Sequence, residues 1–230
     1  MDGNRELKLT INNKWNPRIL NWLNTFCQPD PEYPYSTISS LYYDTYNWDC
    51  AAEKVNSYYL KTKYRLRWYT LFEQNENPNG AIFSEVKHRI GSTRKKFRLP
   101  SSLTLNDINY PDFNDSRFSI FVKELRAQGL KIQKTITPVY VVRYCRHRFV
   151  DSLYSSRICL DANIEVPRIN CNRIPCASSL PMRLETAVVE IKGSNENIPP
   201  YLQNLISLGC RKASFSKYEA CYQKLLNMLN

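Results

Sequence analysis

Charged and apolar residues alternate along several segments of the chain. Within residues 62–69, one face would carry Lys63, Arg65 and Arg67, and the other Tyr64, Leu66 and Trp68. A period of two residues is typical of a half-buried β-strand. Like charges spaced ~7 Å apart on one face repel one another unless an anion lies against them. This segment therefore predicts a strand whose ionic face meets a polyanion.

The same alternation recurs elsewhere and predicts a sheet with one ionic side. It appears in residues 6–11, 82–89, 94–99, 139–149, 157–161 and 188–192. Two architectures suit such strands: an open sheet whose charged side meets water, or a closed barrel whose charged side points inward and whose apolar side is covered by helices. A barrel removes exposed strand edges. Because unpaired buried charge is very costly, the interior of such a barrel would be a wet, anion-filled tunnel.

Helical periodicity appears in three segments that would cover the apolar side of the strands. The first follows Asn16 as cap and Pro17 in the first turn, the second spans residues 115–129 and stops at Gly129, and the third spans residues 218–229. A polar hairpin loop is predicted at residues 73–80 and irregular structure at residues 163–182. The fold class is mainly β with flanking helices (α+β), in one domain over residues 1–230.

The charge balance points to an anionic partner. Lys and Arg total 32 against 21 Asp and Glu, which gives a net charge of +11 and a pI near 9.3. Nucleic acid, a membrane surface and phosphorylated small molecules all remain compatible with this charge. The cations lie in phase on strands and are not interleaved with exposed stacking aromatics, so no specific nucleic acid is expected. With no transmembrane run and no signal peptide, the chain is expected to be cytoplasmic.

Cysteine and glycine usage narrows the chemistry further. The eight cysteines form no Cys-x-x-Cys pair and only two histidines accompany them, which favours free thiols over structural zinc. The six glycines form neither a Walker loop nor a dinucleotide-binding loop. Any bound phosphate is therefore expected to be held by side chains.

Eight short blocks, taken in order, resemble a known family. They are SLYYDT at 40–45, KYRLRWY at 63–69, EVK at 85–87, KFR at 96–98, YCR at 144–146, RICLD at 157–161, VEIK at 189–192 and SFSKY at 214–218. Together they resemble the VTC domain, the catalytic domain of vacuolar transporter chaperone-type polyphosphate polymerases, within the triphosphate tunnel metalloenzyme (CYTH-like) superfamily. The resemblance implies an eight-stranded antiparallel β-barrel that forms a triphosphate tunnel. It also implies transfer of the γ-phosphoryl group of ATP to a growing polyphosphate chain.

The resemblance also implies a set of site residues. The catalytic residues would be Arg65, Arg67, Lys87, Arg146 and Lys217. The residues binding phosphate or ATP would be Lys8, Lys63, Arg65, Arg67, Lys87, Lys96, Arg98, Arg146, Arg157, Lys192 and Lys217. Glu190 would hold Mn²⁺ or Mg²⁺, whereas Glu6 and Glu85 are candidate metal ligands with ion pairing as the alternative. The implied partners are ATP and inorganic polyphosphate or triphosphate; no membrane segment or particular protein partner is predicted.

Two departures from the family pattern bear on the activity. Ser214 stands where the fungal polymerases have lysine, and Arg211 or Lys212 could supply the missing cation. Asn4 stands where the hydrolytic branch has a metal-binding glutamate, which argues against a triphosphatase. A tunnel triphosphatase and a non-catalytic polyphosphate-binding module remain the alternatives.

Two acidic residues outside the set just given have structural expectations of their own. Asp44 is expected to be a turn or cap residue, and Asp161 is expected to pair with Arg157 on the same strand face.

Overall fold

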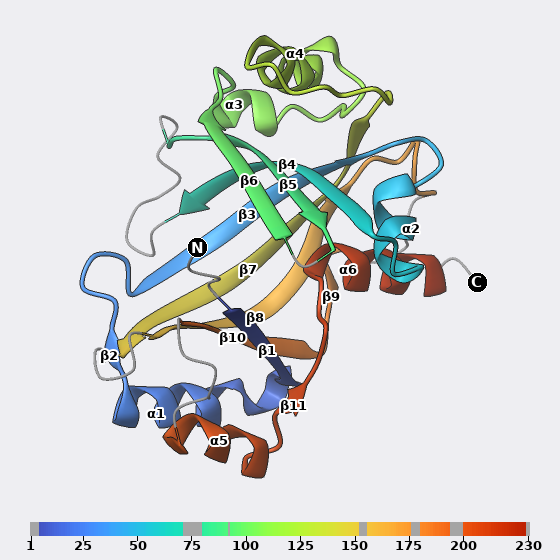
Figure 1. Cartoon of the computed structure of the whole chain (residues 1–230). Helices are drawn as coiled ribbons and strands as arrows, with labels where there is room; N and C mark the ends of the chain where they lie inside the picture. Colours follow the sequence, from blue (N-terminus) through green and yellow to red (C-terminus); the bar gives the residue numbers. More distant parts are fainter. Residues whose placement is uncertain are drawn as a thin grey trace. The chain divides into compact units, whose positions relative to one another are not determined.

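The computed structural model describes residues 5–70, 80–91, 93–151, 156–175, 180–193 and 200–228. Its strands are β1 (Arg5–Asn12), β2 (Gln28–Pro29), β3 (Tyr35–Asp44), β4 (Leu60–Thr70), β5 (Phe83–Ile90), β6 (Thr93–Pro100), β7 (Thr137–Asp151), β8 (Ser156–Ile169), β9 (Met182–Arg183), β10 (Thr186–Gly193) and β11 (Arg211–Lys212). Its helices are η1 (Asn13–Trp15), α1 (Asn16–Phe26), α2 (Asp49–Val55), α3 (Leu105–Ile108), η2 (Ser116–Ser119), α4 (Ile120–Ala127), α5 (Pro200–Ser207) and α6 (Lys217–Asn227) (Figure 1).

The strands form a single hydrogen-bonded sheet, and the predicted mainly β fold with flanking helices is confirmed. The strand order is β11-β1-β10-β8-β7-β3-β4-β5-β6, with β2 beside β7 and β9 beside β8. The pairs for which a register is defined are antiparallel. In the described part of the chain, β11 and β6 stand at the two ends of this order. Hydrogen bonding therefore does not close the sheet, and the predicted eight-stranded barrel is not confirmed.

Backbone contacts divide the chain into two compact units. Unit 1 comprises Met1–Thr37, Tyr144–Ile164 and Arg183–Ser216, and unit 2 comprises Ile38–Arg143, Glu165–Met182 and Lys217–Asn230. Strands β3, β7 and β8 contribute residues to both units. One domain over residues 1–230 stays a prediction.

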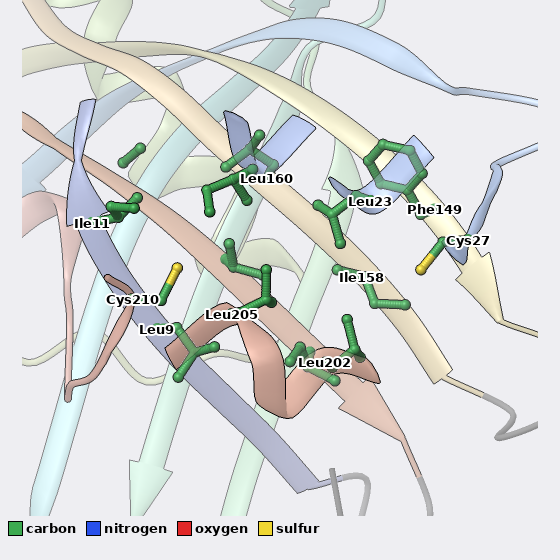
Figure 2. Packing of buried hydrophobic residues seen from close by; sticks show 14 of the residues in the cluster. Leu9, Ile11, Leu23, Cys27, Phe149, Ile158, Leu160, Leu202, Leu205 and Cys210 are labelled. Carbon is green, nitrogen blue, oxygen red and sulfur yellow. The ribbon is translucent and has the colours of Figure 1, made fainter. Parts of the chain in front are cut away.

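The core of unit 1 lies between strands and two helices. Alternation along β1 buries Leu9 and Ile11, while α1 buries Ile19 and Leu23. Figure 2 shows Leu23 from α1, together with Leu202 and Leu205 from α5, packing against apolar residues of β1 and β8. The helix α1 begins at Asn16, the residue expected to precede it as cap, and has Pro17 in its first turn. Burying one face of each element leaves the opposite face of β1, β8 and β10 for ionic residues.

The core of unit 2 lies under α3 and α4. Leu66 of β4 and Val86 of β5 share a buried cluster with Phe121 and Leu125 of α4. The helix expected at residues 115–129 is present as η2 followed by α4, and it ends before Gly129, whose φ of +79° suits a helix C-terminus. The helix expected at residues 218–229 is present as α6. The apolar face of β4 and β5 is thus covered, and their ionic face is the other one.

Several sequence predictions differ from the structure or fall outside it. The segment 163–182 was expected to be irregular, but β8 runs on to Ile169 and β9 follows, because Ile164 and Val166 continue the buried side of the strand and Ile169 is buried as well. Helix α2 was not predicted. The loop at 73–80 lies outside the described residues except for Gly80. The seven described cysteines are free thiols, and Cys176 lies outside the described residues.

Candidate functional site

The ionic side of β4, β5 and β6 in unit 2 is built as rows of cations, and is called here the β4–β6 face. It consists of Lys61, Lys63, Arg65, Arg67, Glu85, Lys87, Arg89, Arg94, Lys96 and Arg98. The pairing places Arg65 opposite Glu85 and Glu85 opposite Arg98. In the next row, Lys63 lies opposite Lys87 and Lys87 opposite Lys96. Neighbouring strands lie ~4.8 Å apart and rows of one face ~7 Å apart.

Glu85 organises cations of its own row and of the two adjacent rows. The side-chain oxygens of Glu85 lie 2.6 Å from Arg65 Nη2, 2.8 Å from Lys96 Nζ, 3.6 Å from Arg98 Nε and 3.8 Å from Arg67 Nη1. Glu85 itself is only 1% exposed. One buried carboxylate therefore holds four predicted phosphate-binding side chains close together.

Strand β3 supplies two further contacts that position the arginines. Arg67 Nε donates to Ser40 Oγ at 3.1 Å, and Arg65 Nη1 donates to the hydroxyl of Tyr42 at 3.2 Å. Neither of these two β3 residues was among the predicted site residues. The signal was present in the sequence, because Ser40, Tyr42 and Asp44 alternate and so share one face of β3. Only the adjacency of β3 and β4 shows which charges that face meets.

Lys217 begins α6, and the residue after it is held firmly. Tyr218 is 1% exposed and its hydroxyl donates to Oδ2 of Asp44. Its ring stacks on Tyr42 at 4.7 Å and on Tyr140 at 5.3 Å between ring centroids. The Tyr140 hydroxyl donates to the Tyr218 carbonyl at 2.6 Å. These contacts fix the first turn of α6, and with it the backbone of Lys217.

Unit 1 carries a second group, called here the β1–β10 face, in which Asp161 joins six predicted site residues. The predicted residues are Glu6, Lys8, Arg146, Arg157, Glu190 and Lys192. Lys8 lies opposite Glu190 in the sheet, and its Nζ lies 3.2 Å from Glu190 Oε1 and 3.6 Å from Glu6 Oε1. Lys8 also donates to the carbonyl of Phe215 at 3.2 Å. Glu190 is 6% exposed, so its carboxylate lies between strands and cations with little access to water.

Arg146 connects the two buried carboxylates of this face. It forms two parallel hydrogen bonds to Asp161, at 2.5 Å from Nε and 2.6 Å from Nη2, and its Nη2 lies 3.3 Å from Glu190 Oε2. Burial alone would lower the pKa of Arg146, but Asp161 outweighs burial and raises this pKa well above its ordinary value. The expected pair of Asp161 with Arg157 was wrong, because the register places Arg157 opposite Lys192 and turns Asp161 toward Arg146.

The structure therefore gathers the predicted residues into two groups, one in each unit. Each group combines Arg forks and Lys point charges around buried carboxylates, an arrangement suited to phosphate oxygens. Residues 4–226 match the profile of the VTC domain. The chain belongs to the VTC domain family. Membership supports a polyphosphate-related or tunnel-type phosphoryl-transfer function for this VTC domain.

Two solved structures share the fold of this VTC domain. The PH1819 protein from Pyrococcus horikoshii OT3 is 14% identical, with a TM-score of 0.50 over 96% of this chain and 99% of that one. A putative adenylate cyclase (bh2851) from Bacillus halodurans is 11% identical, with a TM-score of 0.53 over 93% of each chain. At such identities the likeness concerns the fold alone, and it is consistent with the CYTH-like superfamily expected from the sequence. No match was found among curated protein sequences.

The carboxylates of this VTC domain suit a metal ion that also binds substrate phosphates better than one held by protein ligands alone. Among the described residues, no three or more His, Cys, Asp or Glu side chains form a metal-binding group. Mg²⁺ commonly takes one or two carboxylates and completes its shell with substrate phosphates and water. Glu190, with Glu6 on the neighbouring strand, fits that pattern. Glu85 is placed among four cations, which compete directly with a metal ion for its oxygens.

Within the described ranges, no helix has the length and apolar character that crossing a membrane requires.

Acid is expected to destabilise the protein through Glu85. Burial would raise the pKa of this carboxyl, but Arg65, Arg67 and Lys96 outweigh burial and lower it from 4.5 to about 2. A lowered pKa contributes stability above the unfolded-state value, and this contribution is lost as the pH falls from about 4.5 toward 2. The shift corresponds to roughly 3 kcal/mol at neutral pH. Glu85→Gln should therefore lower the free energy of unfolding by about this amount at pH 7, measured by urea titration at several pH values.

As the pH falls to about 2, wild type and the Glu85→Gln variant should converge, because protonation removes the same charge. Glu165→Gln is the matched control: Glu165 also pairs with an arginine, Arg143, whose side chain is 45% exposed, so the change should cost less than ~1 kcal/mol. A difference in the free energy of unfolding between wild type and Glu85→Gln that stays constant down to pH 2 would contradict the lowered pKa of Glu85.

Proposed function

We propose that this VTC domain is an ATP-dependent polyphosphate polymerase, which transfers the γ-phosphoryl group of ATP to the end of a growing inorganic polyphosphate chain. Phosphoryl transfer needs little covalent help from a protein. It needs phosphates held in line and the developing charge on their oxygens neutralised. Arg65, Arg67 and Lys96, preorganised around Glu85, provide such charge in unit 2. Lys8 and Arg146 provide it in unit 1.

The observation that carries the choice of a polymerase is the pairing of the carboxylates. Asp161 is engaged by Arg146, Glu190 by Lys8 and Arg146, and Glu85 by four cations. A carboxylate held among cations is a weak base, so none of these three is well suited to take a proton from water. A terminal phosphate is already ionised at neutral pH and needs no such base. The chain is therefore better suited to a phosphate acceptor than to hydrolysis.

The proposed metal is Mg²⁺ or Mn²⁺, held by Glu190 with Glu6. When bound, such an ion neutralises charge on phosphate oxygens. In unit 2, Arg65 and Arg67 would orient phosphates and Lys87 and Lys96 would balance their charge. In unit 1, Arg146 would orient phosphates and Lys8 would balance their charge. Lys217 would add a cation from the first turn of α6. The closed tunnel that the family resemblance implies stays a prediction.

The test measures the product made from ATP. Purified protein is incubated with ATP and Mn²⁺ or Mg²⁺, and polyphosphate, ADP and free phosphate are followed together. We expect one ADP for each phosphoryl group added to polyphosphate. The rate of polyphosphate formation should fall about 100-fold or more in Arg67→Ala and in Glu190→Ala. Lys131→Ala, which removes an exposed cation, should leave the rate within about 2-fold.

The other outcomes are equally informative. Free phosphate without polyphosphate would assign the protein to the triphosphatase alternative. Polyphosphate binding without turnover of ATP would assign it to a binding module.

A further inference from the structure

The β4–β6 face continues past the predicted phosphate-binding residues toward the turn that joins β5 to β6. The register places Lys61 opposite Arg89, and Arg89 opposite Arg94. These three cations, called here the outer row, lie four residues along the strands from the row of Glu85, or ~14 Å. The row of Lys63, Lys87 and Lys96 lies between them. The paired positions of these two rows contain cations only, so the face forms a continuous positive track.

The outer row lies beside Gly91, the residue that follows β5. Gly91 has φ of +58°, and its amide donates to the carbonyl of Tyr59 at 2.9 Å. Arg89 Nε donates to the Gly91 carbonyl at 2.8 Å, which orients the guanidinium at the end of the hairpin. Within the described part of the chain, the Arg89 Nη groups and Lys61 Nζ contact no acceptor. Arg89 and Arg94 are exposed, so a ligand can reach them.

Protection of a sheet edge does not account for this arrangement. Edge strands often carry Lys or Arg to prevent pairing with another chain, and β6 is an edge strand in the strand order. However, Lys61 lies on β4, which is separated from that edge by β5 and β6. Like charges directly opposite one another destabilise an antiparallel pair. A row of three across three strands therefore favours an anionic ligand over edge protection.

We propose that the outer row binds the chain of linear inorganic polyphosphate, beyond the phosphates held around Glu85. This inference rests on the proposed function, because it names the part of the same face that would bind the growing chain. Nucleic acid suits the track less well. Two aromatic residues of this face, Phe83 and Tyr69, lie at its other end beneath the Arg98 guanidinium, 3.7 and 5.6 Å from the ring centroids. The paired positions of the outer and middle rows carry no ring. The exposed ring of Tyr59 lies against Gly91 beside the outer row, so the test includes a single-stranded DNA.

The experiment compares binding of short and long chains. Affinities of the purified protein for tripolyphosphate and for long-chain polyphosphate are measured without ATP by competition with a fluorescent polyphosphate. Wild type should bind the long chain more tightly. A triple variant, Lys61→Gln with Arg89→Gln and Arg94→Gln, should lose about 10-fold or more for the long chain and change less than about 3-fold for tripolyphosphate. Its salt dependence should also become shallower.

Matched controls separate a specific path from general charge. Lys95→Gln with Lys123→Gln and Lys131→Gln removes three exposed charges from unit 2 and should weaken long-chain binding by less than about 3-fold. A second comparison needs single changes only: Arg94→Gln should weaken long-chain binding, whereas Lys95→Gln, on the opposite face of β6, should not. Far-ultraviolet circular dichroism checks that each variant is folded.

Four results would overturn the inference. They are the absence of a length preference in wild type, an equal loss for both phosphate ligands, an equal loss in the control triple variant, and an oligo(dT) of similar charge that binds as tightly as polyphosphate and weakens in parallel. This test measures binding without ATP, so its result does not depend on polymerase activity. If the polymerase proposal alone failed, the protein would make no polyphosphate from ATP and would still show this binding pattern.

Discussion

Arg146→Ala is expected to lower the free energy of unfolding by about 3–5 kcal/mol and to abolish most of the proposed activity. Arg146 donates to both carboxylate oxygens of Asp161, and Asp161 is 0% exposed. Removing the guanidinium leaves a buried carboxylate without its bidentate donor, and removes one of the two cations beside Glu190. Chemical denaturation measures the first effect, and polyphosphate formation by protein that is still folded measures the second.

Two further variants separate the charge of Arg146 from its shape. Arg146→Lys keeps the positive charge but loses the two parallel hydrogen bonds, so its stability and activity should fall between those of wild type and Arg146→Ala. Arg143→Ala, on the same strand, removes an arginine whose side chain is 45% exposed and paired with Glu165, and should cost less than ~1 kcal/mol. Equal stability of Arg143→Ala and Arg146→Ala would contradict the role given to Asp161.

The ionic faces of the strands could be predicted from the sequence, because the period of two is a local property of the chain. The segments predicted at 62–69, 82–89 and 94–99 lie almost wholly within β4, β5 and β6. Their apolar residues, such as Leu66 and Val86, are buried as that period requires. The same period of two residues predicted the charged residues on the opposite face of these strands.

The partner of each charge could not be predicted, because it depends on register between distant strands. Asp161 is four residues from Arg157 on the same face, yet the sheet pairs Arg157 with Lys192 and brings Arg146 to Asp161. Likewise, that Glu85 would collect four cations depends on β4 and β6 flanking β5 in a particular register. A single sequence contains no direct record of those offsets.

The end of β8 was missed for a related reason. The prolines and cysteines of residues 163–182 suggested irregular structure, and Asn163, with φ of +53°, and Pro167 are residues that usually interrupt a strand. Ile164, Val166 and Ile169 nevertheless remain buried, so burial of these side chains outweighs the local preferences.

Closure of the sheet into a barrel was inferred from the cost of exposed strand edges. The strand β6 is nevertheless compatible with an edge position, because nearly all its residues are exposed and four of them are cations.

Asp44→Ala is expected to be the other most damaging single change, at about 3–5 kcal/mol of unfolding free energy. The expectation that Asp44 is a turn or cap residue is confirmed. Its Oδ1 accepts from the amides of Thr45 at 2.7 Å and Cys50 at 2.9 Å, and its Oδ2 accepts from the amide of Ala51 at 3.1 Å and from the Tyr218 hydroxyl. Asp44 is 0% exposed, so alanine would leave these donors without an acceptor and without water.

The effect of Asp44→Ala should reach the site through α6. Since Tyr218 would lose its anchor next to Lys217, polyphosphate formation should also fall, by about 10-fold at temperatures where the variant is folded. Tyr218→Phe removes only the hydroxyl and should cost about 1–2 kcal/mol. Asp49→Ala, five residues along the chain, removes a carboxylate that pairs with the exposed Lys134, and should cost less than ~1 kcal/mol. If Asp44→Ala were as stable and active as Asp49→Ala, the buried carboxylate would neither cap α2 nor position α6.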